Sequence, residues 1–405
     1  MKIVKKRLAV IGGGASGTVA AIEAKREFPQ AEVVIFEKKP MACKKILVTG
    51  NGRCNFTNED LAPRHFYGES KFLKKVLTSV YADTENYFRS LGILSYHEDG
   101  RIYPRSQQSS AMREALINKT ETLGITIKTE TPVSSLKKTK TGYSVNGESF
   151  DAVIMAGGGK AAAVQGSDGS CIPLVKVMNH TFTPLYPALC GLVTSDKDII
   201  NLKGVRTEAT AELFSGNKLL GSESGEIQFT EKAVSGIPVM NLSHLCRNNK
   251  NLNISLDLCP EITETELTEH LSDMCRNAPE MQAEIALGGI VNIKLGYTVL
   301  NRSKIKKHAI LKELHSNDIR NIVAVLKSFR IVISGTKSFD SAQITCGGIN
   351  TQEIHPENMM SKINDGLFFC GEIIDIHGDC GGYNLHLAWT TGRIAGSSAA
   401  EYLKG

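Results

Sequence analysis

The chain has 405 residues, of which 41% are hydrophobic and 22% charged, values typical of a folded protein and against intrinsic disorder. The formal net charge of +5 is small for this length, so the composition does not indicate a nucleic-acid-binding protein. No run of about 18 apolar residues occurs, which excludes a transmembrane helix, and the length predicts two or three domains.

The ten cysteines are scattered along the chain, and none forms a CxxC pair. This pattern is typical of reduced thiols rather than of a disulfide framework or a zinc site, so we expect a cytoplasmic protein with no bound metal. The apolar stretch at 8–14 is short and ends in glycines, which does not match a secretory signal peptide.

The first motif is typical of a dinucleotide-binding site. An apolar run at 8–11 predicts a buried parallel strand, and it leads directly into GGGASG at 12–17, a GxGxxG pattern. We expect a helix at 15–28 and a second strand at 32–36. A lone GxGxxG is weak evidence, but its position between a strand and a helix makes the prediction specific.

Each glycine of this motif has its own physical role. Gly12 allows a sharp turn, Gly14 allows the backbone to approach a pyrophosphate, and Gly17 allows the helix to pack close to the strand. The helix N-terminus offers free N–H groups and a partial positive charge to phosphates. Glu37, 20 residues past Gly17, is placed to accept hydrogen bonds from ribose hydroxyls, and its charge disfavours NADP.

Further segments extend the predicted site along the chain. Residues 44–58 (KKILVTGNGRCNFTN) form a loop rich in Gly, Asn and Thr, which suits close passage of a planar ligand and its phosphates. Residues 123–136 resemble a strand pair, in which the backbone of Val133 would contact adenine. A buried strand is expected at 151–159, where it ends in glycines beside the cofactor.

The C-terminal region favours FAD over NAD. An apolar strand at 366–375 carries Glu372 and Asp375, which would bring a carboxylate to the ribityl chain. The glycine-rich stretch 378–385 precedes a long helix at 385–403, whose N-terminus would face the flavin N1–C2=O edge and stabilise negative charge on the reduced flavin. An NAD domain has no need of this second element, which is distant in the chain.

The middle of the chain alternates as strands do. We expect strands at 191–193, 209–214, 218–220, 227–229 and 252–258, followed by a last strand at 329–335. Gly204, Gly216 and Gly225 punctuate these strands.

Between those strands, residues 261–328 have a helical pattern. Thr263 or Thr265 would cap one helix and Asn317 or Asp318 another. This region has no second GxGxxG, so we expect no dedicated NAD(P)H domain, and NADH or NADPH would bind only transiently as electron donor.

Four groups of residues together resemble the YhiN/BaiN-like family of flavoproteins, over essentially the whole chain. They are GGGASG at 12–17, the loop 44–58, GEIQFT with SGIP at 225–238, and GGIN…GLFFCGEIIDIHGDCGGYNLHLAWTTGRIAG at 347–396. The resemblance implies an α/β fold with a discontinuous Rossmann-like FAD-binding domain (1–187 and 342–405). It also implies an inserted β-barrel domain (188–258 and 322–341) carrying a helical subdomain (259–321).

The resemblance also implies a set of FAD contacts in this chain. With the residues singled out above, the expected cofactor-binding residues are Gly12, Gly14, Ala15, Ser16, Gly17, Glu37, Lys38, Lys44, Asn51, Arg53, Cys54, Val133, Gly157, Gly371, Glu372, Asp375, Asn384 and Leu385. The chain departs from the family at Cys43, at His377 and at His386, where glutamine is usual.

Candidate catalytic residues are few. His377 and His386 flank the glycine turn at the expected flavin edge, and either is a candidate to donate a proton near neutral pH, although a purely structural role is the more frequent one for such residues. Cys54 follows Arg53, which would favour its thiolate, but it has no partner cysteine nearby, so packing is the better interpretation.

The family includes a bile-acid ene-reductase and an aminoacetone oxidase. We therefore expect an FAD-dependent oxidoreductase, foremost an NAD(P)H-dependent reductase of a conjugated C=C bond in a small organic or steroid-like substrate. The first alternative is an amine or aminoketone oxidase that uses O₂. A third is a flavoprotein that modifies or binds RNA, which the modest charge disfavours. We expect a small-molecule substrate near a domain junction and neither nucleic acid nor membrane as partner.

Overall fold

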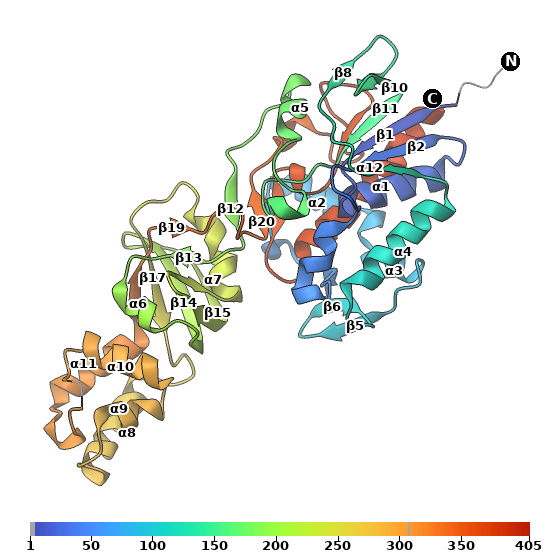
Figure 1. The fold of residues 1–405 in the computed structure, drawn as a ribbon. Coiled ribbons are helices and arrows are strands. Elements are labelled where there is room, and N and C mark those ends of the chain that lie inside the picture. Colours follow the sequence, from blue (N-terminus) through green and yellow to red (C-terminus); the bar gives the residue numbers. More distant parts are fainter. Residues whose placement is uncertain (1–4, 307) are drawn as a thin grey trace. The chain divides into compact units, whose positions relative to one another are not determined.

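The computed structural model describes residues 5–306 and 308–405, and its contacts divide the chain into two compact units (Figure 1). Unit 1 runs to Pro187 and resumes over Phe339–Gly405, and unit 2 is Ala188–Ser338. The chain therefore leaves unit 1 once, forms unit 2 and returns. The limits expected from the sequence for the FAD domain differ from those of unit 1 by three residues at the return.

A parallel sheet forms the centre of unit 1. Its five strands lie in the order β21 (Leu367–Phe369), β11 (Ala152–Met155), β1 (Arg7–Ile11), β2 (Glu32–Phe36) and β7 (Thr126–Lys128). Four of the strands are almost continuous buried apolar runs, as expected inside a parallel sheet that is covered on both faces, whereas the edge strand β7 is short and partly exposed. This order confirms the predicted Rossmann-like topology and joins strands from both ends of the chain.

Helices α1 (Ala15–Glu27) and α12 (Tyr383–Lys404) pack against each other unusually closely. A Cβ atom added at Gly392 would lie 2.5 Å from the Ser16 carbonyl oxygen, and one at Gly396 would lie 2.2 Å from that of Ala20. Because Ser16 faces Gly392 and Ala20 faces Gly396, the two helices run in the same direction. Only glycine permits this backbone approach.

The remaining strands and helices of unit 1 surround this centre. They are β3 (Thr57–Asn58), β4 (Phe66–Gly68), α2 (Ser70–Leu77), α3 (Thr84–Arg89), β5 (Ser95–Glu98), β6 (Arg101–Pro104), α4 (Ser109–Thr122), β8 (Leu136–Lys138), β9 (Tyr143–Val145), β10 (Glu148–Phe150), α5 (Ile172–Val177), β12 (Tyr186–Ala188), β20 (Ile344–Cys346) and β22 (Ile376–Gly378). Short 3₁₀ segments include η1 (Lys44–Gly52) and η8 (Gly371–Ile373).

Unit 2 contains a seven-stranded sheet in the order β18-β17-β14-β15-β16-β13-β19, with antiparallel neighbours. In chain order its elements are β13 (Leu192–Val193), α6 (Lys197–Asn201), β14 (Arg206–Ser215), β15 (Lys218–Phe229), β16 (Ala233–Ser235), α7 (Ile237–Leu242), β17 (Leu252–Asp257), α8 (Glu264–Asn277), α9 (Ala283–Gly288), α10 (Ile293–Arg302), α11 (Ser316–Lys327), β18 (Phe329–Val332) and β19 (Gly335–Thr336). Helices α8 to α11 form the predicted helical region.

The structure corrects two expectations for unit 2. The strands predicted at 218–220 and 227–229 form one strand, β15, because Gly225 stays in register opposite Ala209 instead of ending the strand. Helix α11 begins three residues earlier than expected. Asp318 is therefore the third residue of the helix, where its carboxylate accepts the His315 N–H at 2.8 Å. The Thr263 cap of α8 is confirmed, with Glu266 completing a capping box.

The two edges of the unit 2 sheet meet in one short segment of chain. β18 pairs with β17, and β19 pairs with β13, although only Ile333 and Ser334 separate β18 from β19. Ser334 N also donates to Val193 O at 2.8 Å. No ladder joins β18 to β19 within the described ranges, so the closed barrel stays a prediction.

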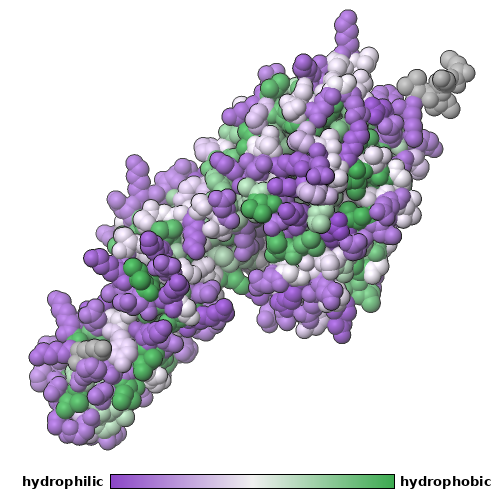
Figure 2. Space-filling model, in the orientation of Figure 1, coloured by the Kyte–Doolittle hydropathy of each residue, from purple (hydrophilic) through white to green (hydrophobic). Residues whose placement is uncertain are grey.

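The surface matches that of an ordinary folded chain. On the face seen in Figure 2, hydrophilic residues predominate and apolar ones are scattered. Within residues 5–306 and 308–405, none of the helices has the length and apolar character needed to cross a bilayer.

The contact between α1 and α12 can be tested with Gly396→Ala. Alanine favours a helix over glycine by about 1 kcal/mol, but the added methyl group would force the two backbones apart, and such overpacking costs about 1–3 kcal/mol or more. We expect a net loss of about 2 kcal/mol in the free energy of unfolding of unit 1. Fluorescence of Trp389, the single tryptophan and fully buried on α12, reports this transition in denaturant.

Glu401→Ala on the exposed face of the same helix is the matched control and should change the unfolding free energy by less than about 0.5 kcal/mol. If Gly396→Ala were as stable as this control, the close approach of the two helices would be wrong.

Candidate cofactor and active site

The glycine turn between β1 and α1 is held by contacts that leave no room for side chains. Gly12 has φ +111°, and a Cβ there would lie 2.4 Å from the Ala156 carbonyl oxygen. A Cβ at Gly17 would lie 2.0 Å from the carbonyl oxygen of Gly12. These two glycines therefore shape the turn and seat the first helix, as their sequence positions predict.

Gly14 differs from its neighbours because it faces open space. Apart from its two neighbours in the chain, no atom of the described residues lies within 4 Å of the position of a Cβ at Gly14, and none of their side chains caps the N-terminus of α1. Ala15 and Ser16 form the first turn, where backbone N–H groups have no partner within the helix. A helix N-terminus that lacks a side-chain cap and borders open space is suited to an anion such as a pyrophosphate.

Glu37 follows β2 directly and is 9% exposed. Its Oε2 accepts the Gly13 N–H at 2.9 Å, and its Oε1 accepts the Lys39 N–H at 2.7 Å. These bonds fix the carboxylate beside the glycine turn and leave acceptor positions on both oxygens for ribose hydroxyls.

The segment that follows β7 lies beside Glu37. Thr131 N donates to Glu37 O at 2.9 Å, and Glu130 N donates to Lys39 O at 3.1 Å. Val133 lies two residues further along and is half-buried in a loop, so the predicted strand pair is wrong in its second half. Its predicted contact with adenine stays a prediction.

The N-terminus of α12 provides a second anchor point for a ligand. Gly381 and Gly382 have φ +133° and +94°, and a Cβ at Gly382 would lie 2.4 Å from Thr57 O. α1 begins opposite the ninth residue of α12. The two helices run in the same direction, so α12 begins about 12 Å upstream of the start of α1. The two uncapped N-termini are thus staggered along one line, as an elongated dinucleotide requires.

Two other predicted residues are engaged through their side chains, Asn384 with the turn before α12 and Glu372 with Lys45 and Thr345. Asn384 Oδ1 accepts the Gly378 N–H at 2.9 Å, and its amide donates to Gly378 O at 2.7 Å. Glu372 pairs with Lys45 Nζ at 2.8 Å and accepts the Thr345 N–H at 2.9 Å. These bonds occupy the side chains, so any contact of Asn384 with a ligand would come from its backbone.

The side chains of three other expected contacts have partners within the protein. Lys38 pairs with Asp168, and Lys44 Nζ donates to Val164 O at 3.3 Å. Arg53 pairs with Glu98 at 2.7 Å. Five expected residues remain. Asn51 lies in η1, Gly157 follows β11 and Gly371 lies in η8. Asp375 precedes β22, and Leu385 lies in the first turn of α12.

Cys54 is fully buried, and burial raises the pKa of its thiol to about 12. This rules out the stabilised thiolate that its neighbour Arg53 suggested, because the guanidinium turns to Glu98 and to Tyr103, 3.2 Å from its hydroxyl. Cys54 is therefore a packing residue of the loop.

The donors and the spaces in unit 1 fit FAD. The open face of Gly14 at the N-terminus of α1 suits a pyrophosphate, and the fixed carboxylate of Glu37 suits a ribose. The N-terminus of α12 suits a flavin. Asn55 Oδ1 is buried beside Gly382 and has no hydrogen-bond partner among the described residues. An unpaired buried acceptor at this point is consistent with a ligand that donates to it.

His386 does not fit the proton donor that its position suggested. Its ring is completely buried, Nδ1 lies 2.9 Å from Thr57 Oγ1 and 3.1 Å from Thr84 Oγ1, and burial lowers its pKa to about 4. At neutral pH the ring is therefore uncharged and joined to two threonines. His377 is 6% exposed and stacks on Tyr67, with ring centroids 5.1 Å apart.

Sequence reasoning missed a polar cluster next to the same turn. Asp379 is 5% exposed and bonds both to the Tyr67 hydroxyl and to His65. The pattern HGD at 377–379 drew attention only to its histidine, although an aspartate in a glycine turn at a helix N-terminus is itself a signal. Its partners, His65 directly before β4 and Tyr67 on β4, are distant in the chain and follow no motif.

A second arrangement in unit 1 resembles a nucleophile triad but is structural. His180 Nε2 lies 2.9 Å from Ser361 Oγ, and His180 Nδ1 lies 3.0 Å from Glu353 Oε2. Ser361 is 1% exposed, and its Oγ already accepts the N–H groups of Ile363 and Asn364. A hydroxyl buried and engaged in this way cannot reach a substrate.

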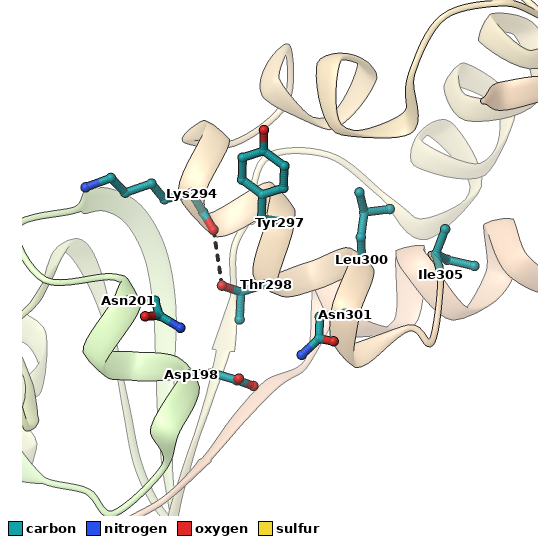
Figure 3. A pocket seen from close by; sticks show the side chains of 8 residues that line it. All are labelled: Asp198, Asn201, Lys294, Tyr297, Thr298, Leu300, Asn301 and Ile305. Carbon is teal, nitrogen blue, oxygen red and sulfur yellow. Dashed lines mark hydrogen bonds between the residues drawn. The ribbon is translucent and has the colours of Figure 1, made fainter. Parts of the chain in front are cut away.

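Unit 2 contains a cavity of about 400 Å³ between α6 and α10 (Figure 3). It is lined by Asp198, Asn201, Lys294, Tyr297, Thr298, Leu300, Asn301 and Ile305. No residue expected to bind the cofactor lines it, and its lining residues belong to no motif singled out from the sequence.

The role of Gly14 is tested by Gly14→Ala. Because the methyl group would enter space that is open in the protein alone, the unfolding free energy of the apoprotein should change by less than about 0.5 kcal/mol. A pyrophosphate in that space would be displaced at a cost of about 1–3 kcal/mol, which corresponds to a ten- to hundredfold weaker affinity for FAD. Titration of apoprotein with FAD measures this affinity.

Gly288→Ala is the matched control, since its nearest neighbouring atom is 3.9 Å away and it lies in unit 2. It should bind FAD as the natural chain does. Equal FAD affinity in Gly14→Ala would exclude the pyrophosphate from this turn.

His386 makes stability depend on pH. Its pKa in the folded chain is about 4, below the ordinary value of 6.5, so the unfolded chain binds the extra proton more strongly and stability falls as pH drops from 6.5 towards 4. His386→Gln cannot titrate. We expect its unfolding free energy to fall by about 2 kcal/mol less between pH 7 and pH 5 than that of the natural chain, measured through Trp389 fluorescence. Equal losses would show that the ring is accessible to protons.

Comparison with known proteins was made on the full chain. A family model described as HI0933-like protein Rossmann domain matches residues 6–398. The chain is 37% identical to the 3-dehydro-bile acid delta(4,6)-reductase of Clostridium scindens, over 98% of this chain and 99% of that protein. It is 24% identical to the ribosomal RNA dihydrouridine synthase of Haemophilus influenzae, over 94% and 95%. Among solved structures, an open-conformation flavocytochrome c3 fumarate reductase matches with 15% identity and a TM-score of 0.49, over 99% of this chain and 79% of that one.

Proposed function

Because the chain belongs to the HI0933-like Rossmann-domain family, we propose that it is an FAD-dependent reductase of a carbon–carbon double bond conjugated to a carbonyl group. NADH or NADPH is the electron donor in this proposal, and the substrate is a small organic or steroid-like molecule. The observation that carries it is the 37% identity, over nearly the full length of both chains, to a reductase of 3-dehydro-bile acids.

A second relative supports the same bond type. Dihydrouridine differs from uridine by a saturated C5–C6 bond, and in uridine that double bond is conjugated to the C4 carbonyl. The synthase that makes it is 24% identical to this chain. Reduction of a C=C bond next to a carbonyl is therefore common to two relatives whose named substrates differ greatly in size.

The chain's own residues would bind and orient the reactants. Bound FAD supplies a hydride that it has received from the nicotinamide. The N-terminus of α1 with Gly14 would hold the pyrophosphate, Glu37 the ribose, and the N-terminus of α12 would stabilise negative charge at the flavin edge. The other cofactor contacts named from the sequence belong to this proposal.

We assign FAD binding to unit 1 and selection of the substrate to unit 2. A scaffold that holds the cofactor and an insert that varies would explain how one family acts on bile acids and on RNA. In this proposal the unit 2 sheet curls into a barrel, because one short segment pairs at both of its edges, and residues 259–321 form its helical subdomain.

Reduction of uridine in RNA is the second candidate function. The relationship to a ribosomal RNA dihydrouridine synthase favours it, whereas the net charge of +5 and the higher identity to the bile-acid enzyme favour the small molecule. An amine or aminoketone oxidase remains as a third possibility from the sequence, and it differs because a nicotinamide would not reduce it.

The test is anaerobic and has two steps. Yellow protein is mixed with NADH and then with NADPH while the visible absorbance band is followed, and the reduced protein is then mixed with a 3-oxo-4,6-diene steroid or with a uridine-containing ribosomal RNA fragment. We expect rapid bleaching by one nicotinamide and return of the band with the steroid.

The remaining outcomes separate the alternatives. Return of the band with RNA alone would establish the second candidate. Absence of bleaching by either nicotinamide, together with bleaching by an amine, would overturn the reductase and favour the oxidase.

A further inference from the structure

The buried carboxylate of Asp379, next to the N-terminus of α12, joins the side chains of His65, directly before β4, and Tyr67, on β4. The Asp379 side chain is 6% exposed, and its Oδ1 accepts the Tyr67 hydroxyl at 2.9 Å. Its Oδ2 lies 3.0 Å from His65 Nδ1, and its backbone N–H donates to His65 O at 3.0 Å. Asp379 is thus fixed by its main chain and shared between a phenol and an imidazole.

The histidine continues this chain of hydrogen bonds towards solvent. His65 Nε2 lies 3.2 Å from Asp60 Oδ2, and the Asp60 side chain is 42% exposed. Because a carboxylate faces each ring nitrogen of His65, both contacts are satisfied as hydrogen bonds only when the ring carries both protons. The hydrogen-bonded groups Asp60, His65, Asp379 and Tyr67 therefore connect solvent to a phenol. His65 is the group among them that can hold an additional proton.

The structure ties this chain of groups to the predicted flavin end of the cofactor site. β4 pairs antiparallel with β22, with Tyr67 opposite His377, and the two rings stack. β22 connects Asp375 to the glycine turn that begins α12. Tyr383, in the first turn of α12, stacks on the His65 ring with centroids 4.7 Å apart.

We propose that Tyr67 is the proton donor of the C=C reduction and that His65 returns the proton to it through Asp379. The inference rests on the proposed function. The hydride forms a new C–H bond at the carbon β to the carbonyl. The π electron pair of the double bond then takes the proton of the Tyr67 hydroxyl and forms a C–H bond at the α carbon. The phenolate then regains a proton that leaves His65 and crosses Asp379, and His65 takes one from solvent beside Asp60. One hydride and one proton are added, and no other reactant is needed.

Several charged and titratable groups surround the relay. Arg64 pairs with Asp60, and Tyr383 packs on the His65 ring from α12. Burial raises the pKa of Tyr383 to about 12, so it stays neutral, and Arg101 of β6 acts on it through its charge. His65 is therefore the member of this set that links the phenol to solvent.

Tyr67→Phe tests the donor in the FAD-loaded protein, with the two half-reactions measured separately. The variant keeps the ring stacked on His377 and should be bleached by the nicotinamide at the natural rate. Its reoxidation by the 3-oxo-4,6-diene steroid should be slowed by about a hundredfold or more. Tyr402→Phe, at the far end of α12 with its side chain partly exposed, makes the same chemical change and should leave both rates unchanged.

Equilibrium binding provides a readout that does not depend on turnover. The saturated ketone product should bind oxidised Tyr67→Phe within about threefold of its affinity for the natural protein, because the hydroxyl acts on the carbon during the reaction. If Tyr67 had only a structural role, the Tyr67→Phe variant would retain FAD less well and bind the product more weakly. Asp379→Asn, which retains an acceptor for the phenol, gives a second variant and should slow reoxidation by about tenfold or more.

The relay is tested by the pH profile of reoxidation. In the natural protein the rate should depend on pH, because the relay passes a proton through His65, whereas in His65→Gln it should be lower and flat over the same range. Natural reoxidation rates in Tyr67→Phe would overturn the donor, and an unaltered pH profile in His65→Gln would overturn the relay. A natural protein that is bleached but reoxidised by no conjugated ketone overturns the proposed function and, with it, this assignment.

Discussion

The parallel contact between α1 and α12 determines the arrangement of the cofactor site. Gly392 and Gly396 allow the backbones of the two helices to approach so closely that a methyl group on either glycine would collide with a carbonyl oxygen. Because the helices are parallel and begin about 12 Å apart along their axes, their N-termini form two staggered positive ends on one side of the sheet. The positions of both N-termini therefore depend on contact between the N-terminal and C-terminal parts of the chain.

Much of this arrangement was predictable from the sequence because strong local signals produce it. Apolar runs at 8–11 and 32–36, with glycines between them, led to β1, α1 and β2 with almost the observed limits. The glycines that precede α12 and the small residues within it predicted a long buried helix in the same way.

The errors have identifiable physical causes. The sequence predicts a strand end at Gly225, but Gly225 pairs with Ala209 of β14, so β15 continues through it. For Cys54, by contrast, the interpretation as a packing residue agrees with the structure, because the thiol is fully buried and the guanidinium of Arg53 pairs with Glu98. The cluster of Tyr67, His65 and Asp379 was missed because its bonds join residues more than 300 positions apart.

Two histidines near the same turn illustrate how environment decides function. His386 is enclosed between threonines and is neutral at pH 7, whereas His65 lies between two carboxylates and reaches solvent. The sequence indicates His386, together with His377, only as a candidate, because both flank the glycine-rich turn, and it offers no signal for His65. The structure favours His65, because a group that passes protons needs a partner on each side and a route to water.

The most direct test of this account is a crystal structure of the yellow protein with FAD bound. We expect the pyrophosphate at Gly14 and the first turn of α1, the adenosine ribose on Glu37, and the flavin ring at the first turn of α12. A flavin ring located at the opposite end of the sheet, away from α12 and Tyr67, would contradict it.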